Sequence, residues 1–164
     1  SLDFSTDFDF ISHAVNWLDT NQNYKPDLIV QLRPTQPMRK VSDIDNCICF
    51  FSTRMEDYDS LRSIIPVTKT PYKMYNIEND SLIPLFSEVN GIKEPYNHCR
   101  QFLPRVYLHN GYIDIIKTST ITTKYSISGD SIYPFVMKST DTVDIDTEED
   151  FINAEKTLLE YNNN

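Results

Sequence analysis

Two acidic residues near the end of the chain have the spacing of a metal site. Asp144 and Asp146 flank Ile145, and on an extended segment residues i and i+2 point the same way. Two convergent carboxylates suit Mg²⁺ or Mn²⁺, and Mg²⁺ commonly completes its coordination with substrate phosphates. The same pattern also fits an acidic strand end followed by a helix cap. Six acidic residues lie within 141–150, and their mutual repulsion calls for a counter-ion.

Arginines form a second group that could do chemistry. Arg33 and Arg39 flank a proline-containing loop, and Arg100 and Arg105 bracket another short motif. In a chain of net charge −9, this placement is typical of a local positive site for a carboxylate or a phosphate, because the guanidinium fork binds either group in a bidentate manner. Arginines scattered over the surface would give a similar pattern.

The composition excludes several functions. With 15 basic and 24 acidic residues the chain would repel duplex DNA, so we expect no nucleic-acid partner. It has three glycines, Gly91, Gly111 and Gly129, whereas glycine-rich phosphate loops need several close together. These residues therefore cannot bind a nucleotide through such a loop. No apolar run approaches 18 residues, so no transmembrane helix is expected.

The cysteines indicate a reducing compartment. Their number is odd and no apolar leader opens the chain, which favours a cytoplasmic protein without structural disulfides. Cys47 and Cys49 lie in an apolar run with helical spacing. We expect them to be buried small hydrophobic residues rather than zinc ligands.

The elements that must position these residues alternate between helix and strand. Apolar residues recur with helical period at Phe10, Ile11, Ala14, Val15 and Leu18, after cap candidates at 5–7. Residues 27–32 predict a strand covered on both faces, and the prolines of 33–39 fix a loop at its carboxyl end. This early alternation argues for a three-layer α/β fold with a mixed sheet.

A second helix is expected next, with a buried stripe made of Val41, Ile44, Ile48 and Phe51. It is followed by a strand at 60–67, a hairpin of 72–77 and 82–86, and an aperiodic excursion at 87–103. The rest is expected to form strand-like sequence over 104–117 interrupted by Asn110-Gly111, a turn at 128–130, strands near 132–138 and at 142–145, and a last helix capped by Thr147 and Asp150.

Four motifs together resemble the acylneuraminate cytidylyltransferases, over nearly the whole chain. Leu32–Arg39 is similar to the family's L-[QR]-P-T-S-P-L-R, and Arg100–Pro104 is similar to R-Q-x-L-P. Asn110-Gly111 is similar to its N-G turn. Asp144–Phe151 with Ala154-Glu155 is similar to D-I-D-T-x-x-D-[FLW]-x-x-A-E. Each motif alone is weak, but the four occur in the family's order and spacing.

The resemblance implies transfer of CMP from CTP to a nonulosonic acid, a sialic acid-like sugar, with release of pyrophosphate. It implies a single domain over 1–164 with a mostly parallel sheet of the nucleotide-diphospho-sugar transferase type, and a homodimer formed through the excursion at 87–105. Asp144 and Asp146 would hold Mg²⁺, or Mn²⁺, on the triphosphate. The residues implied around the sugar and nucleotide are Arg33, Thr35, Lys73, Arg100, Gln101 and Asn110.

Three departures from the family pattern limit what the resemblance implies. Arg33 stands where sialate-specific members have Gln, and His109 stands where some have Arg, so a legionaminate-like sugar also fits. The family opens with A-R-G-G-S-K-x-I-P-x-K-N, which binds the CTP phosphates, and residues 1–164 do not match that loop. We therefore expect the chain to correspond to the carboxyl-terminal two thirds of such an enzyme. Another D-x-D nucleotidyl- or glycosyltransferase, or an inactive dimerisation domain, remains an alternative.

Overall fold

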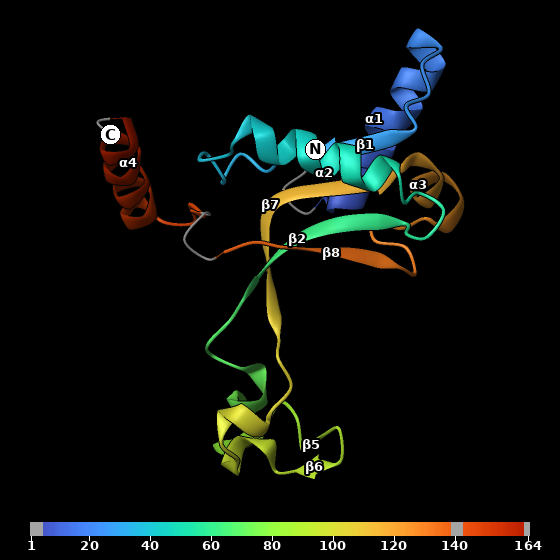
Figure 1. The fold of residues 1–164 in the computed structure, drawn as a ribbon. Coiled ribbons are helices and arrows are strands. Elements are labelled where there is room, and N and C mark those ends of the chain that lie inside the picture. Colours follow the sequence, from blue (N-terminus) through green and yellow to red (C-terminus); the bar gives the residue numbers. More distant parts are fainter. Residues whose placement is uncertain (1–4, 139–142, 163–164) are drawn as a thin grey trace. The chain divides into compact units, whose positions relative to one another are not determined.

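The computed structural model describes residues 5–138 and 143–162, with side chains of the last helix to residue 159. The chain forms two compact units. Unit 1 comprises Ser1–Ile64 and His109–Asn164, and unit 2 comprises Ile65–Leu108. Figure 1 shows the order of the elements along the chain.

A four-stranded sheet forms the centre of unit 1, in the order β1-β7-β2-β8. Its strands are β1 (Leu28–Gln31), β7 (Tyr107–Lys117), β2 (Ser60–Pro66) and β8 (Ile132–Val136). β1 pairs with β7 in antiparallel register, with Ile29 opposite Ile116. β2 pairs with β8 in parallel register, with Leu61 opposite Tyr133.

β7 is antiparallel to the other three strands of the sheet. Lys117 N donates to Asp59 O over 3.2 Å, and Ile113 N donates to Ser63 Oγ over 2.9 Å, so residue numbers rise along β2 as they fall along β7. β1, β2 and β8 therefore point the same way. This confirms the expected α/β fold with a mixed sheet, in which three of the four strands point the same way although only β2 and β8 form a parallel pair.

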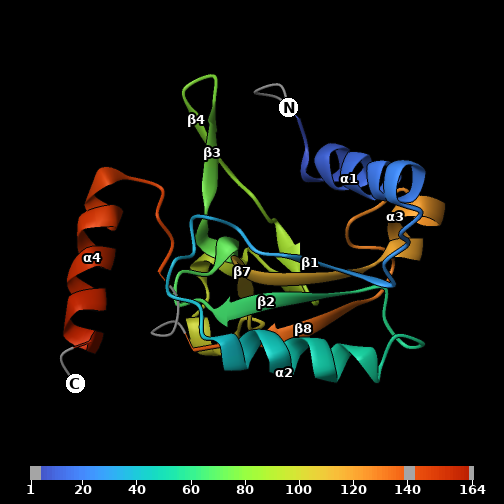
Figure 2. The ribbon, with the colours of Figure 1, turned by 90° about the horizontal axis from the view of Figure 1, so that it is seen from above.

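Helices cover both faces of the sheet (Figure 2). α1 (Asp7–Gln22) and α3 (Thr118–Lys124) lie on one face, and α2 (Val41–Ser52) lies on the other. Under α1 the core combines four buried residues, Ile11, Val15, Ile116 and Ile121. Within the described ranges, no helix is long and apolar enough to cross a membrane.

Local capping explains where α1 begins. Thr6 Oγ1 accepts a hydrogen bond from Asp9 N over 3.3 Å, and Asp9 Oδ2 accepts one from Thr6 N over 2.8 Å, which is a capping box. The helix ends at Asn23, whose φ of 49° is left-handed. Of the expected apolar stripe, Ile11 and Val15 are buried, whereas Phe10 remains 44% exposed.

The expected stripe of α2 is partly wrong. Phe51 is fully buried and Ile44 and Ile48 are half-buried, but Val41 at the first turn is 72% exposed. The expectation for the cysteines also holds for only one of the two. Cys47 is buried and Cys49 is exposed, because residues two apart on a helix face nearly opposite directions.

Two strand expectations need correction. β7 runs without a break from Tyr107 to Lys117, although Asn110-Gly111 was expected to interrupt it. Gly111 accommodates this with a left-handed φ of 65°, and pairing with both neighbouring strands outweighs the turn preference of Asn-Gly. No strand forms at 143–145, and residue 142 lies outside the described residues. α4 (Glu148–Asn162) follows that segment as expected.

Unit 2 contains two short hairpins. β3 (Tyr75–Glu78) pairs with β4 (Ser81–Pro84), and β5 (Glu88–Val89) pairs with β6 (Ile92–Lys93). Their two-residue turns, Asn79-Asp80 and Asn90-Gly91, both have positive φ, as tight hairpin turns require. Three 3₁₀ helices, η1 (Pro71–Lys73), η2 (Pro95–Asn97) and η3 (Arg100–Phe102), complete the unit, which includes the whole of the 87–105 excursion.

Candidate functional site

The proline loop after β1 is held to β7 by Arg39. Its guanidinium donates to the carbonyl oxygens of Tyr112, Arg33 and Gln36, the last over 2.7 Å. Burial lowers the pKa of Arg39 from its ordinary value of 12.5, but the group stays charged at neutral pH. Arg39 therefore fixes the shape of the loop rather than facing a ligand, contrary to the anion-binding interpretation of its position in the sequence.

A second contact joins the loop to the Asn110-Gly111 segment. Gln36 is 2% exposed, and its Nε2 donates to Asn110 O over 2.6 Å. Asn110 is itself buried, and its Oδ1 accepts a hydrogen bond from Tyr112 N over 3.3 Å. The side chain of Asn110 thus supports the backbone here. Its predicted contact with substrate stays a prediction.

Tyr112, on β7, anchors the start of α2 next to the Asn110-Gly111 segment. Its hydroxyl accepts from Lys40 N over 2.8 Å and donates to Asp43 Oδ2 over 2.9 Å. Burial, with the neighbouring Asp43 carboxylate, raises the pKa of Tyr112 to about 12. The hydroxyl therefore stays protonated and keeps both hydrogen bonds across the physiological range.

The acidic segment reaches the same loop from the other end of the chain. Ile145 N donates to Thr35 O over 3.0 Å. The Ile145 side chain is one wall of a small apolar pocket of about 220 Å³, whose other lining residues are Pro37, Met38, Phe151, Ala154, Glu155 and Leu158. Asp144 and Asp146, on either side of Ile145, are exposed. The alternation expected for this segment holds even though no strand forms.

Thr147 and Asp150 fix the direction in which α4 leaves the segment. Asp150 N donates to Thr147 Oγ1 over 3.2 Å, and Thr147 N donates to Asp150 Oδ2 over 2.9 Å. The Thr147 hydroxyl also donates to Asp150 Oδ2 over 2.7 Å, and this bond, with that from Thr147 N, lowers the pKa of Asp150 from its ordinary value. The predicted capping box is confirmed, and Asp150 is used by the cap.

Asp144 and Asp146 fit a shared magnesium site rather than a site made by protein alone. In residues 5–138 and 143–162, no three His, Cys, Asp or Glu side chains gather around one point. Two exposed carboxylates match what Mg²⁺ takes from a protein when substrate phosphates and water supply its other ligands. The residues present therefore fit the metal that the sequence predicts.

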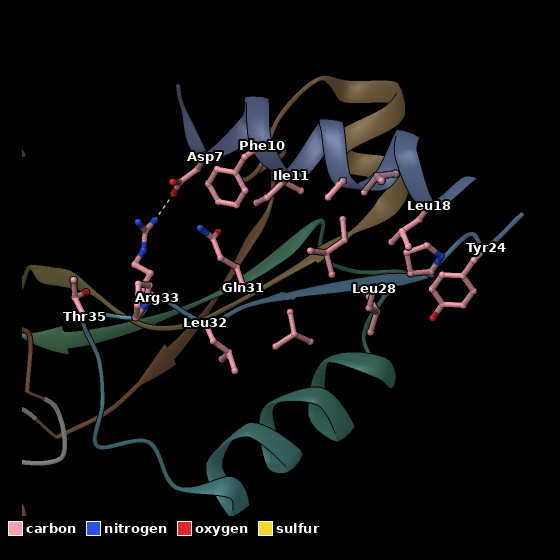
Figure 3. A pocket seen from close by; sticks show the side chains of 16 residues that line it. Asp7, Phe10, Ile11, Leu18, Tyr24, Leu28, Gln31, Leu32, Arg33 and Thr35 are labelled. Carbon is pink, nitrogen blue, oxygen red and sulfur yellow. Dashed lines mark hydrogen bonds and ion pairs between the residues drawn. The ribbon is translucent and has the colours of Figure 1, made fainter. Parts of the chain in front are cut away.

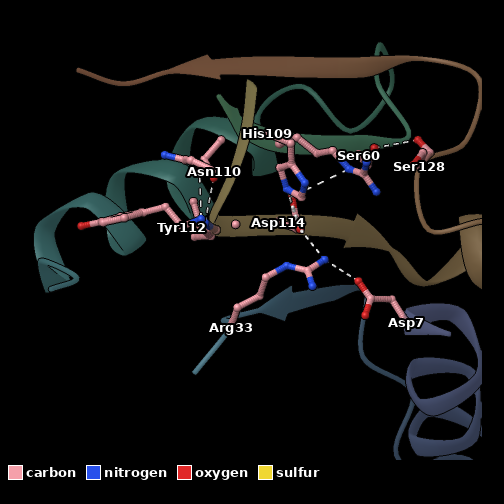
Figure 4. A network of polar contacts seen from close by, with 12 residues as sticks. Asp7, Arg33, Ser60, His109, Asn110, Tyr112, Asp114 and Ser128 are labelled. Carbon is pink, nitrogen blue, oxygen red and sulfur yellow. Dashed lines mark hydrogen bonds and ion pairs between the residues drawn. The ribbon is translucent and has the colours of Figure 1, made fainter. Parts of the chain in front are cut away.

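A polar network on β7 lies next to the proline loop (Figure 4). Asp114 is 3% exposed, and His109 Nε2 lies 2.9 Å from its Oδ1. Arg62 Nε lies 3.8 Å from the same oxygen, and Arg33 lies 4.0 Å from the other while also pairing with Asp7. Asp114 was not among the residues predicted for the site. The sequence does contain a signal for this residue, because Asp114 is the single acidic residue within the apolar run Ile113–Ile116.

The predicted site residues are divided between the two units. Arg33, Thr35, Asn110, Asp144 and Asp146 all lie in unit 1, where the contacts above bring their three motifs together. Lys73, Arg100 and Gln101 lie in unit 2. Lys73 Nζ donates to Tyr96 O over 2.9 Å, and the other two are exposed on η3.

Solved structures define the class of fold. A CMP:2-keto-3-deoxy-manno-octonic acid synthetase, solved in complex with CTP, matches 97% of this chain with a TM-score of 0.60 and 10% identity, over 70% of its own length. The 4-diphosphocytidyl-2C-methyl-D-erythritol synthase of Anaerococcus prevotii matches 94% of this chain with a TM-score of 0.58 and 14% identity, over 67% of its own length. The chain therefore shares the α/β fold of these two enzymes.

Proteins of similar sequence point to one group of cytidylyltransferases. N-acylneuraminate cytidylyltransferases of Streptococcus agalactiae serotypes V and III are 26% and 27% identical over 154 residues, 94% of this chain. This confirms the resemblance to the acylneuraminate cytidylyltransferases. The chain spans about a third of the length of these relatives, 34%. No family model matches it.

Proposed function

We propose that the polypeptide carrying these residues is a cytidylyltransferase that transfers CMP from CTP to a nonulosonic acid and releases pyrophosphate. One observation carries the proposal. The hydrogen bond from Ile145 N to Thr35 O places the acidic D-x-D segment against the proline loop, which Gln36 and Arg39 tie to β7. The similarity to N-acylneuraminate cytidylyltransferases of Streptococcus agalactiae supports the same reaction.

In this reaction the anomeric hydroxyl of the sugar acid attacks the α-phosphorus of CTP. A new oxygen–phosphorus bond forms, the bond to pyrophosphate breaks, and the hydroxyl proton is lost to a base or to water. Asp144 and Asp146 would hold Mg²⁺, or Mn²⁺, which when bound neutralises charge on the triphosphate. The contribution of this chain is to keep these two carboxylates exposed and beside the loop.

Arg33 is the residue of unit 1 best suited to the carboxylate of the sugar acid. Its guanidinium is one-third exposed and pairs with the half-buried Asp7, so a ligand carboxylate could take over that pairing. We include Thr35, Asn110, Lys73, Arg100 and Gln101 in the substrate site on the family resemblance. On the same basis we propose a cytoplasmic homodimer formed through residues 87–105.

The substrate is tested by measuring pyrophosphate release from CTP and Mg²⁺ with different sugar acids. We expect release with N-acetylneuraminate or a legionaminate-type acid, and much less with the eight-carbon 2-keto-3-deoxy-octonic acid. Faster release with the eight-carbon acid would replace the proposed substrate while leaving the reaction class unchanged. If none of the sugar acids gives pyrophosphate release, in a polypeptide that folds and binds CTP, the proposed function is contradicted and an inactive domain is favoured.

A further inference from the structure

The carboxylate of Asp114 is almost completely buried and is hydrogen-bonded by one side chain, that of His109. The Asp114 side chain is 4% exposed, and its two oxygens lie 2.9 and 3.1 Å from His109 Nε2. Arg62 Nε and Arg33 Nη2 lie 3.8 and 4.0 Å away, so they balance the charge of Asp114 without a hydrogen bond. Among the described residues, no other group donates to this carboxylate.

This contact decides which nitrogen of His109 carries the proton. A carboxylate only accepts hydrogen bonds, so Nε2 is the donor, and in the neutral ring Nδ1 then has the lone pair that can accept a proton. Nδ1 has no hydrogen-bond partner within residues 5–138 and 143–162, and the His109 side chain is 30% exposed. A ligand can therefore reach a proton acceptor whose orientation is fixed by a buried carboxylate.

Gly111 lets His109 and Asp114 meet. In a regular strand, side chains an odd number of residues apart point to opposite faces, and these two residues are five apart on β7. Gly111 lies between them with a left-handed φ of 65° and interrupts the alternation. Both side chains therefore reach the same side of β7, where Figure 4 shows them in contact. Interruptions of this kind are frequent beside active sites, where they re-aim a side chain.

His109 lies beside residues predicted to bind substrate. It precedes Asn110, whose carbonyl oxygen accepts a hydrogen bond from Gln36 of the proline loop. Arg33, to which we assign the sugar carboxylate, lies against the same Asp114 carboxylate as His109. In a nonulosonic acid, one carbon atom bears both the carboxylate and the anomeric hydroxyl. A sugar acid held by Arg33 through its carboxylate therefore presents that hydroxyl within the cluster that includes His109.

We propose that His109 is the general base of CMP transfer and that Asp114 is the residue that positions it. This inference rests on the proposed function. His109 Nδ1 takes the proton of the anomeric hydroxyl while the hydroxyl oxygen forms its bond to the α-phosphorus of CTP and the bond to pyrophosphate breaks. Asp114 stabilises the resulting imidazolium, which returns its proton to solvent after the product leaves.

The proposal predicts a loss of activity in acid, because a protonated His109 cannot accept the hydroxyl proton. The charged groups that face the His109–Asp114 pair are Arg62 on β2, Arg33 in the proline loop and, beyond Arg33, Asp7 at the start of α1. Figure 3 shows the Arg33 guanidinium turned toward Asp7. We expect kcat of the unmodified polypeptide to fall as the solution is made acidic.

Chemical rescue distinguishes a base from a structural residue. Pyrophosphate release from CTP, Mg²⁺ and a nonulosonic acid is measured in the full polypeptide that carries these residues. We expect His109→Ala to lose roughly a hundredfold or more of kcat at pH 7, with little change in KM. Added imidazole should restore part of the rate, and the restored part should rise with pH as imidazole loses its proton. His13→Ala, at an exposed histidine of α1, should keep its activity and not respond to imidazole.

Asp114 is tested through its effect on His109. We expect Asp114→Asn to lower kcat and leave KM for the sugar acid nearly unchanged, whereas Arg33→Gln should mainly raise that KM. Unfolding in urea shows whether each variant folds.

Acylation by diethyl pyrocarbonate, which attacks neutral imidazole, provides a measurement that needs no turnover. The sugar acid without CTP should slow acylation of His109, and His13 is the internal reference that should react at an unchanged rate.

Four results would overturn the inference. They are full activity in His109→Ala, a loss of activity in that variant that imidazole does not reduce at any pH, acylation of His109 that the sugar acid does not slow, and a kcat that rises on acidification. The last result would make His109 a cation that binds an anion instead of a base. An unmodified polypeptide that folds, binds CTP and releases no pyrophosphate would contradict the proposed function itself.

Discussion

Ile145 N donates a hydrogen bond to Thr35 O over 3.0 Å, so the D-x-D segment and the proline loop share one backbone contact although they lie near opposite ends of the chain. The Ile145 side chain lines a small apolar pocket together with Pro37 and Met38 of the same loop and Phe151 of α4. Asp144 and Asp146 are therefore placed by Ile145 and not by a sheet ladder. Ile145 is the apolar anchor of the segment, and Asp146 N also donates to Asp150 Oδ2 over 3.3 Å at the start of α4.

Replacing this anchor should impair function more than folding. Ile145→Ala enlarges the pocket that Ile145 lines with Pro37 and Phe151, and because Ile145 is only half-buried we expect a loss of about 1–2 kcal/mol in unfolding free energy. CMP transfer should fall further than stability alone explains, since the two carboxylates lose their fixed position. Ile152→Ala, at an exposed site on α4, is the control and should change neither quantity much. Equal activities for the two variants would contradict the anchoring role.

Arg39→Lys should loosen the proline loop. A lysine has no planar fork, so it cannot donate at once to the carbonyl oxygens of Arg33, Gln36 and Tyr112. We expect a loss of about 2 kcal/mol in unfolding free energy, measured in urea. Arg105→Lys, at an exposed position, should cost almost nothing. A cost for Arg39→Lys as small as that of the control would mean that the loop is held by other contacts.

Gly111→Ala tests the close approach of β7 to the loop. Gly111 has φ 65°, and an added Cβ would lie 2.7 Å from Arg33 Cδ. Gly91 has φ 80° with nothing within 4 Å, so Gly91→Ala isolates the backbone cost. We expect unfolding free energy to fall by about 1 kcal/mol for Gly91→Ala and about 2 kcal/mol for Gly111→Ala. Equal losses would mean that Arg33 moves aside without cost.

Asp59 should make the chain less stable in acid. Lys124 Nζ donates to Asp59 Oδ2 over 2.7 Å, and Asp130 N donates to it over 2.8 Å. The Lys124 hydrogen bond, with the amides of Asp130 and Ser131, lowers the Asp59 pKa from 3.8 to about 2. Because the folded-state pKa is depressed, this stabilisation is present above about pH 4 and is lost as pH falls toward 2.

Asp59→Asn should remove that part of the acid dependence and lower stability at pH 7. Asp130→Asn is the control, because Asp130 shares Lys124 but is 88% exposed, and exposed ion pairs contribute little. Thermal unfolding between pH 2 and 7 measures both effects. An Asp59→Asn profile parallel to that of the unmodified chain would show that Asp59 does not control the acid dependence.

Local signals in the sequence predicted the elements that local contacts determine. The capping boxes at Thr6 and Thr147 involve side chains three residues apart, so they are visible without the fold. α3 had no such signal, since four of its seven residues are threonines, which favour strands. It is held by distant partners: Thr118 Oγ1 donates to Pro26 O, and Thr120 Oγ1 donates to Asp59 O.

The candidate site was predictable only in part, for a similar reason. Asp144, Asp146 and the proline loop have recognisable residue types and spacing. The roles of Arg39 and Gln36 as supports for the loop depend on carbonyl groups of β7, which no local pattern reveals. The pairing of His109 with Asp114 was not predicted, because it joins two residues five apart within β7, whereas the candidate residues were expected at strand ends and in loops.

Asp144 and Asp146 are the residues that we propose to carry the metal-dependent chemistry of a cytidylyltransferase. The most direct measurement is Mg²⁺-dependent CMP transfer from CTP to a nonulosonic acid by Asp144→Asn, Asp146→Asn and Glu149→Gln, the last replacing an exposed acid of the same segment. We expect either Asp variant to lose roughly a hundredfold or more of the activity. Glu149→Gln should keep nearly all of it. Full activity in the two Asp variants, with folding unchanged, would contradict the account.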